Sequence, residues 1–369
     1  KMIRLFLCGD VMTGRGIDQV LPHPVDPRLH EPYMTSALGY VALAEKANGP
    51  IPSPVDFRYI WGDSLDVLAE WAADVRLINL ETSITRSDTF WPNKGIHYRM
   101  SPANTPCLTA ANLNCCALAN NHVLDWGYDG LEDTLAALAR AGIAHAGAGP
   151  DLHRASEPAI LDPGNGNRVL VFSMATGSSG VPGSWAASAG SAGIHRLPGL
   201  SADIARRVAE QVGDYRRQGD IVVASIHWGD NWGYDIPAEQ TDFAHRLIDD
   251  AGVDIIHGHS SHHPRAIEVY RDKPVFYGCG DFINDYEGIG GHETFRGDLG
   301  LMYFVDISND GALSALRMVP MQMRRFRLNW AEDADTDWLA AVLDREGRGF
   351  NTAVSRKDRS LALSWTRNG

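Results

Sequence analysis

The chain has 369 residues and a formal net charge of −13. No apolar run approaches the roughly 20 residues that a membrane helix needs, and the acidic balance excludes a general affinity for nucleic acid, whose phosphates require a basic surface. The five cysteines are odd in number and form no C-x-x-C pair, so neither a disulfide framework nor a zinc knuckle is indicated. We expect a globular cytoplasmic protein that binds neither nucleic acid nor a membrane.

The first predicted strand, residues 3–10, ends in a carboxylate. It reads Ile-Arg-Leu-Phe-Leu-Cys-Gly-Asp and is followed by Gly14 and Gly16. Open α/β sheets bind ligands beyond the carboxyl ends of their strands, so Asp10 is a candidate for chemistry. The alternative is that Gly-Asp here is an ordinary turn signal.

Residues 20–62 show no clear period. Prolines break most helical continuations in this segment, at Pro22, Pro24, Pro27, Pro32, Pro50, Pro52 and Pro54. Because the segment is too long for an ordinary connection, we predict a functional, lid-like insertion.

A helix and two strands are predicted next. Residues 64–73 open with a capping serine and carry apolar residues at helical spacing. Residues 75–81 form a strand-like run ending in Glu81, and a third apolar run, 113–122, ends in two asparagines and His122. These polar endings repeat the pattern of the first strand.

The middle of the chain alternates helix and strand. Helical periodicity runs over 128–142 and 200–217, with a strand at 168–174 between them. Residues 177–193 are rich in Gly, Ser and Ala, which is typical of a loop. Alternation of this kind indicates a largely parallel α/β core.

The next two strands end in histidines. Residues 220–229 contain His227 close to their end, and helix 238–251 leads into an apolar run that ends in four histidines, including His259 and His262. Imidazole binds transition metals at neutral pH, so we interpret these two as metal ligands. A solvated, His-rich turn is the alternative.

The C-terminal part is more meander-like. Strands are expected at 266–270, 274–281, 301–306 and 316–320, and a closing helix at 335–345. We predict a single compact domain over 1–369, with a meander and helix at about 298–350.

Six polar residues thus lie at the ends of five predicted strands: Asp10, Glu81, Asn121, His227, His259 and His262. Burying carboxylates beside imidazoles is costly unless a cation compensates. Carboxylate, amide and imidazole ligands suit a divalent ion, and no thiolate is offered. We predict one or two divalent ions, with Mn, Mg, Fe, Zn and Ca left open and Glu81 as a candidate bridge.

These motifs, in this order, resemble the calcineurin-like metallophosphoesterase superfamily in its CapA-type branch, over roughly residues 3–285. The resemblance implies an α/β fold, a metallophosphatase-like four-layer sandwich with mixed sheets flanked by helices. It also implies metal positions at Asp10, Glu81, Asn121, His227, His259 and His262, with His122 as an acid/base residue. Met12 stands where the superfamily usually has a histidine ligand, and Glu81 where it usually has Asp.

His292 lies in a glycine-flanked loop, where close CapA-type relatives tend to carry an aromatic residue. This combination resembles CapA-like enzymes of lasso-peptide pathways that epimerise the C-terminal tryptophan of a precursor peptide. The resemblance implies a metal-dependent peptide epimerase in which a metal binds the terminal carboxylate while His292 and Asp10 exchange the Cα proton, with His122 as a substitute for either. An exposed loop histidine is the alternative.

Two other activities stay open on the same residues. One is a metal-dependent phosphoesterase in which His122 protonates the leaving group. The other is an amide hydrolase or ligase acting on γ-linked glutamate, as the name of the capsule family suggests. In each case the expected partner is a peptide or a small anionic substrate.

Overall fold

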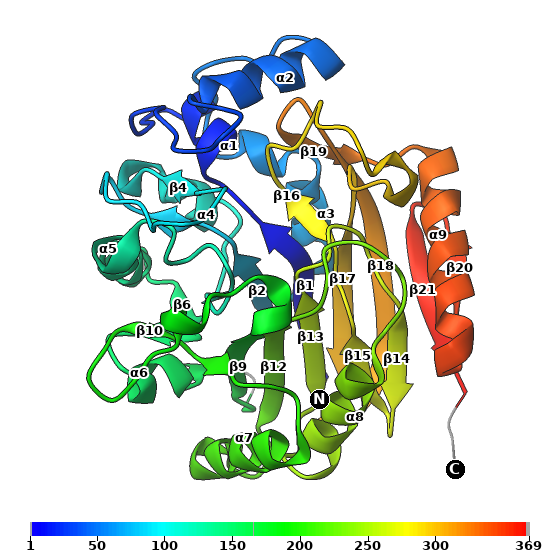
Figure 1. The fold of residues 1–369 in the computed structure, drawn as a ribbon. Helices are drawn as coiled ribbons and strands as arrows, with labels where there is room; N and C mark the ends of the chain where they lie inside the picture. The colour runs from blue at the N-terminus through cyan, green and yellow to red at the C-terminus, as the bar shows by residue number, and fades with distance from the viewer. Residues whose placement is uncertain (1, 165, 367–369) are drawn as a thin grey trace.

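The computed structural model describes residues 2–164 and 166–366. Two β-sheets lie against one another, with helices covering their outer faces (Figure 1). The polar strand ends of the sequence therefore belong to two sheets rather than one.

The larger sheet has ten strands in the described part of the chain. Its order is β20 (Thr352–Lys357), β21 (Ser360–Trp365), β18 (Leu313–Arg324), β17 (Leu299–Ile307), β1 (Ile3–Val11), β2 (Val75–Leu80), β5 (Cys115–Ala117) and β6 (Ala144–Ala146), with β16 (Asp281–Ile283) beside β1 and β19 (Arg327–Trp330) beside β18. Strands β1, β2, β5 and β6 are parallel to one another, and β16 is parallel to β1. Strands β17 and β18 are antiparallel to their neighbours.

The second sheet has seven strands within the same described ranges. Its order is β11 (Arg196–Leu197), β9 (Val169–Thr176), β12 (Ile221–His227), β13 (Ile255–His259), β15 (Lys273–Phe276) and β14 (Ile267–Tyr270), with β8 (Ala159–Leu161) beside β9. Strands β11, β9, β12, β13 and β15 are parallel to one another. Strand β8 is antiparallel to β9, and β14 is antiparallel to β15.

Helices and short elements complete the fold. The α-helices are α1 (Arg15–Val20), α2 (Leu38–Asn48), α3 (Ser64–Trp71), α4 (Pro106–Thr109), α5 (Gly127–Arg140), α6 (Leu152–Ser156), α7 (Ala202–Tyr215), α8 (Ala238–Asp249) and α9 (Asp333–Gly347). Two short pairs are β3 (Ser83–Ile84) with β4 (Arg99–Met100), and β7 (Ala148–Gly149) with β10 (Gly193–Ile194). Short 3-10 turns are η1 (Tyr59–Trp61), η2 (Pro102–Asn104), η3 (Gly177–Ser179), η4 (Gly183–Trp185), η5 (Glu293–Phe295) and η6 (Arg348–Phe350).

Side-chain alternation along the strands explains the layers. In β1, Leu5 and Leu7 pack into the core between the two sheets, whereas Phe6 and Cys8 face the outer core formed with α1, α3, α4 and α5. In the second sheet, Val223 of β12 faces the inter-sheet core, while the alternate residues pack under α7 and α8. This helix–sheet–sheet–helix order confirms the predicted four-layer α/β sandwich with mixed sheets.

Several local expectations differ from the structure. The predicted strand 113–122 forms β5 only over Cys115–Ala117, because the following residues turn around the Asn120 side chain, whose amide oxygen accepts from the backbone of His122 and Val123. The segment 20–62 contains α2 rather than irregular chain alone. Beyond the meander, the hairpin β20–β21 was not predicted.

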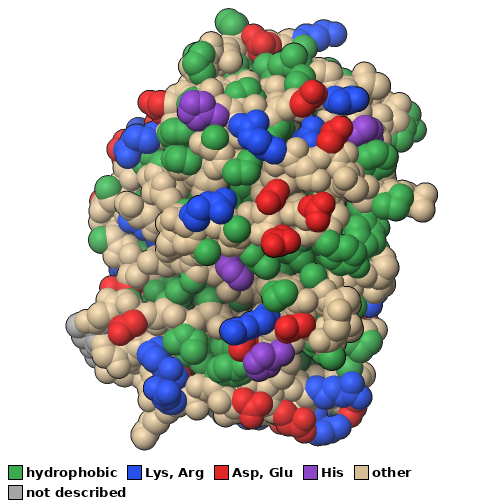
Figure 2. Space-filling model, turned by 90° about the vertical axis from the view of Figure 1, so that its left-hand side faces the viewer, with side chains coloured by type: hydrophobic (Ala, Val, Ile, Leu, Met, Phe, Trp, Pro, Cys, Tyr) green, Lys and Arg blue, Asp and Glu red, His purple; other side chains and the backbone are tan. Residues whose placement is uncertain are grey.

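The surface carries no broad patch of one charge on the face drawn in Figure 2, where acidic and basic side chains are interspersed. Over the described residues, none of the helices combines the length and apolar character needed to cross a bilayer.

Candidate metal centre

The carboxyl ends of parallel strands from both sheets converge on one site. Asp10 lies near the end of β1, and His227 and His259 end the neighbouring strands β12 and β13, where they are paired in register. One ligand atom from each of these three buried residues lies within 4.8 Å of the others. The sheet geometry thus brings together three of the predicted ligands.

Two buried carboxylates at this site lack full hydrogen bonding. Asp10 Oδ1 accepts a 2.7 Å hydrogen bond from the Asn79 side chain, but Asp10 Oδ2 and Glu81 Oε2 have no partner among the described residues. Burial and the neighbouring Asp281 raise the pKa of Asp10 to about 7, and burial and Asp10 raise the pKa of Glu81 well above its usual range. Such a pair needs protons or a cation.

A hydrogen-bond chain behind the site fixes the tautomer of His259. The backbone oxygen of Cys8 can only accept, so His257 Nε2 donates to it over 2.8 Å. His257 Nδ1 then accepts the hydroxyl proton of Ser225 at 2.9 Å. The Ser225 oxygen is left to accept from His259 Nε2 at 2.8 Å. The proton of neutral His259 is therefore on Nε2, and its Nδ1 carries a lone pair.

His227 presents a second lone pair to the same point. Its Nε2 donates to Asn121 Oδ1 at 3.1 Å, which leaves Nδ1 unprotonated. His227 Nδ1 and His259 Nδ1 lie 2.8 Å apart, and Asp10 Oδ1 lies 4.0 Å from His259 Nδ1. Burial lowers the pKa of both histidines well below the usual range, so both are neutral. Two lone pairs that face each other beside a carboxylate fit a bound cation.

His262 lies next to this group on a strained loop. The preceding Ser260 has a φ of 114°, a conformation that L-residues rarely adopt and that tends to occur at functional sites. His262 Nδ1 bonds Asp281, with its two carboxylate oxygens at 3.0 and 3.1 Å. Burial opposes protonation of His262, but Asp281 outweighs it and raises its pKa. Asp281 pairs with Asp10 in the β1–β16 register.

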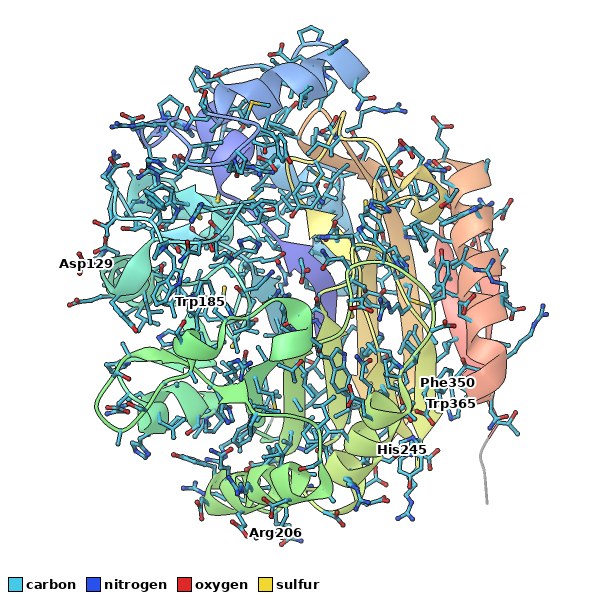
Figure 3. All side chains as sticks on the ribbon, in the orientation of Figure 1. Asp129, Trp185, Arg206, His245, Phe350 and Trp365 are labelled. Atoms are coloured by element: carbon cyan, nitrogen blue, oxygen red, sulfur yellow. The ribbon has the colours of Figure 1, made fainter. Side chains whose placement is uncertain are left out.

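His122 is held by a carboxylate and a lysine. Its Nδ1 lies 2.6 Å from Asp125, and its Nε2 lies 3.9 Å from Glu81. Lys94 pairs with the same Asp125 at 2.9 Å and lies over the ring of Trp185, which is buried inside the molecule (Figure 3). Burial chiefly lowers the pKa of His122 to about 4. The imidazole is therefore neutral and oriented, with Nε2 toward the carboxylates.

His292 lies at the entrance rather than in this buried group. It is exposed, it precedes η5, and its ring stacks on Trp232 with centroids 4.1 Å apart. The same Trp232 contacts His262 at 5.1 Å between ring centroids. The catalytic roles predicted for His292 and Asp10 stay predictions.

A cleft of about 1090 Å³ opens beside this group and is lined by several of its residues. Its walls include Glu81, Asn121, His122, His227, His262, Asp281 and His292. Residues of the 20–62 segment form part of the wall, among them Tyr33, Met34 and Tyr40. The cleft is large enough for a peptide or another extended molecule.

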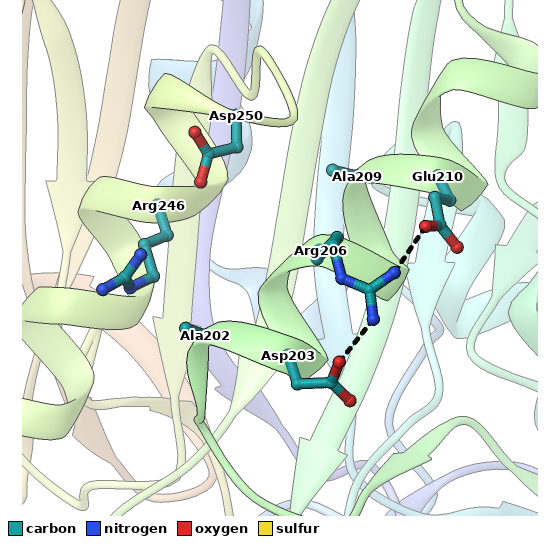
Figure 4. Close-up of a pocket in the computed structure, with 7 residues that line it drawn as sticks. All are labelled: Ala202, Asp203, Arg206, Ala209, Glu210, Arg246 and Asp250. Carbon is teal, nitrogen blue, oxygen red and sulfur yellow. Dashed lines mark hydrogen bonds and ion pairs between the residues drawn. The ribbon is translucent and has the colours of Figure 1, made fainter.

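A second hollow lies elsewhere and differs in character. It has a volume of about 720 Å³ and lies between α7 and α8 (Figure 4). Arg206 there pairs with Asp203 and Glu210 of its own helix. The charge of Arg206 is therefore matched within its own helix, and such surface ion pairs contribute little energy.

The predicted metal residues therefore differ in position. Asp10, His227 and His259 form the centre, Glu81 and Asn121 border it, and His262 adjoins it through Asp281. The sequence reasoning did not assign roles to Asn79, Asp125, His257 or Asp281. Asp281 follows Gly-Cys-Gly at a predicted strand end, as Asp10 follows Cys-Gly, and this repeated pattern would have identified it.

Residues 4–286 match the family described as "Bacterial capsule synthesis protein PGA_cap". A "probable polyglutamine synthesis accessory protein" of Mycobacterium tuberculosis is 52% identical over 365 residues, covering 98% of this chain and 96% of the relative. The "PGA biosynthesis protein CapA" of Bacillus subtilis is 30% identical over 215 residues, covering 58% of this chain and 54% of the relative.

Among solved structures, a 5'-nucleotidase precursor of Thermus thermophilus aligns with a TM-score of 0.48 at 16% identity, covering 87% of this chain and 54% of that one. The family match extends over the residues that form the metal centre, from Asp10 to Asp281. The chain belongs to the bacterial capsule synthesis protein PGA_cap family.

Proposed function

We propose that the protein is a metal-dependent enzyme that cleaves or forms an amide bond in a γ-linked glutamate chain. The observation that carries the metal dependence is the pair of Nδ1 lone pairs of His227 and His259, which face each other at 2.8 Å beside Asp10. The mycobacterial relative is named for polyglutamine synthesis and the Bacillus subtilis relative for PGA biosynthesis, and both names support a polymeric amide substrate.

The residues present fit a divalent ion. Asp10, His227 and His259 would hold it, with Glu81, Asn121 and His262 available around it. When bound, such an ion polarises a carbonyl or activates water for attack on it. The unpartnered oxygens of Asp10 and Glu81 are the clearest sign that this group is incomplete without a positive charge.

The protein's own residues provide proton transfer and substrate binding. Asp125 holds His122 through Nδ1, so Nε2 is the atom that carries a proton to or from a substrate at the cleft. Because neutral His122 keeps its own proton on Nδ1, Nε2 would first take a proton from the attacking water in amide cleavage and then give it to the departing amine, which otherwise leaves as a poor anionic group. The cleft has a volume of about 1090 Å³ and His122 is among its lining residues, so a segment of a chain can lie against this histidine.

A second candidate activity is Cα epimerisation of a peptide's C-terminal residue, and the position of His292 favours it. This histidine lines the cleft and is exposed, while Asp10 is buried and lies beside Asp281 of the cleft wall. Two acid/base groups that approach one carbon from different sides are what inversion requires, because one removes the proton and the other returns a proton to the opposite face. The lasso-peptide resemblance of His292 points the same way.

One experiment separates these activities. The purified chain with added Mn²⁺ is incubated with a γ-linked glutamate oligomer, with a Trp-terminated peptide in deuterated water, and with an aryl phosphate. Release of new amine ends that is lost in His122→Ala and kept in His292→Ala supports the amide proposal.

Exchange of the α-hydrogen that is lost in His292→Ala supports epimerisation instead. The control is His153→Ala, which removes an exposed histidine that pairs with Glu157 away from the cleft. Turnover of the aryl phosphate alone would contradict both proposals.

A further inference from the structure

Two tyrosines join the acid/base histidines across the cleft. The hydroxyl oxygens of Tyr98 and Tyr286 lie 2.7 Å apart, and both residues line the cleft. The ring of Tyr98 lies 4.0 Å from that of His122, and the ring of Tyr286 meets that of His262 edge-on at 5.5 Å. The hydrogen-bonded tyrosine pair therefore connects the ring of His122 to that of His262.

When two hydroxyls bond to each other, one of the two O–H groups is left without an acceptor inside the pair. Burial raises the pKa of both phenols well above the usual range, so both keep their protons. One O–H donates to the other oxygen, and the second O–H has no acceptor in residues 2–164 and 166–366. Glu81 Oε2 nearby is itself unpartnered, so it does not accept this proton.

Exposure decides which hydroxyl is free. Tyr98 is only 2% exposed, while Tyr286 is partly open to the cleft. The Arg15 guanidinium lies over the Tyr98 ring, 4.8 Å from its centroid, and 5.9 Å from that of Tyr286. The nearer positive charge makes the Tyr98 hydroxyl the better donor within the pair. Tyr98 therefore donates to Tyr286, and the Tyr286 proton points into the cleft.

We propose that Tyr98 and Tyr286 form an oxygen-binding subsite, in which Tyr286 donates a hydrogen bond to a carboxylate or developing oxyanion of the substrate and Tyr98 strengthens that donor. This subsite deepens the proposed function and rests on it. Three cations of the wall are already paired, Arg15 with Asp285 and Glu31, Arg296 with Asp298 and Asp335, and Lys94 with Asp125. A neutral phenol supplies the donor without another buried charge.

The test measures binding directly. The probes are γ-glutamylglutamate and N-acetyltryptophan, each titrated into the full chain with Mn²⁺ by calorimetry. Tyr286→Phe is expected to raise the Kd of at least one probe roughly tenfold or more, as for loss of a hydrogen bond to a charged acceptor. Tyr98→Phe is expected to raise it only about twofold to threefold, because it removes the supporting donor. Tyr270→Phe, whose hydroxyl bonds Asp249, is the matched control and should bind like wild type.

Each outcome decides the proposal. An unchanged Kd for Tyr286→Phe, a larger effect of Tyr98→Phe, or no probe binding by the wild type would overturn it. If a variant fails to fold, the wild type still decides, because donation to an anion must shift its tyrosine absorbance on probe binding. Probe binding that depends on Tyr286 without amide cleavage or α-hydrogen exchange would reject the proposed function and keep the subsite. Turnover that Tyr286→Phe leaves unchanged would keep the proposed function and reject the subsite.

Discussion

Binding of a divalent ion should stabilise the protein at pH 7 far more than at pH 5. The reason is Asp10, whose pKa rises from the ordinary 3.8 to about 7 because the carboxylate is buried and lies near Asp281. Without an ion, the stability that protonated Asp10 contributes is complete below pH 3.8 and is lost as the pH rises through about 7. An ion that binds the carboxylate replaces this proton, so proton and ion compete.

The size of the effect follows from that competition. With a pKa of about 7, half of the protein has ionised Asp10 at pH 7, but only about 1% at pH 5, so apparent ion affinity falls about 50-fold. An ion at ~100 times its Kd at pH 7 stabilises by about 2.7 kcal/mol, and the same concentration at pH 5 by about 0.6 kcal/mol. At about 2.1 cal/mol/K per residue, Tm rises by roughly 3–4 °C at pH 7 and by under ~1 °C at pH 5.

Differential scanning calorimetry of EDTA-treated protein, with Mn²⁺ added at each pH, measures both shifts. Asp10→Asn keeps an acceptor for the Asn79 amide but removes the titrating group, so it should lose the Mn²⁺ response at both pH values. Asp18→Asn is the matched control, because Asp18 is also buried with a pKa of about 6 but is bonded away from the metal centre by Asn104, Ser101 and Val25. Equal shifts at pH 5 and pH 7, or a full response in Asp10→Asn, would refute the reasoning.

Three further predictions test the fold and the site. Gly9→Ala would place a methyl carbon 1.8 Å from the backbone oxygen of Gly280, so we expect the free energy of unfolding to fall by more than about 3 kcal/mol. A stability in urea equal to that of the wild type would contradict the close packing of β1 on β16. Arg15→Met leaves the buried carboxylates of Glu31 and Asp285 without their ion-pair partner, so it should lower the free energy of unfolding in urea by about 3–5 kcal/mol. A decrease below ~1 kcal/mol would mean that this ion-pair network does not stabilise the fold. Asp125→Asn weakens the hydrogen bond that orients His122, so it should lower kcat about 10- to 100-fold on whichever substrate is turned over, while the metal content stays unchanged. An unaltered kcat would show that His122 does not transfer the proton.

The sequence was most informative where strand ends carry polar residues. Asp10, His227 and His259 each close an apolar run, and parallel strands present their carboxyl ends at one edge of a sheet, so the pattern predicted the end of the strand at which each residue lies. The pattern did not encode that β1 belongs to one sheet and β12 and β13 to another, whose edges meet at the site. The layer order was predicted from the family resemblance. Its physical basis is that alternation along β1 and β12 sends side chains to two different cores.

Other elements lacked a readable pattern. Helix α2 buries only Tyr40 and Ala44 along its length, so its apolar face is too narrow to be recognised among the surrounding prolines. Strand β20 alternates between buried or partly buried and exposed positions with mostly polar residues, because it lies at the edge of the larger sheet. Such elements acquire their structure from neighbours distant in the chain, and local periodicity does not record those neighbours.

The chemistry of the centre depends on bonds that no motif encodes. The Nδ1 atom of His259 carries a lone pair because a hydrogen-bond chain from the Cys8 oxygen through His257 and Ser225 places the proton of His259 on Nε2. A sequence with the same histidines but no acceptor behind His257 leaves that proton free to occupy Nδ1, where it would block a cation. The spacing of the histidines therefore identifies the residues, whereas the backbone of β1 determines that they are ready to bind a metal.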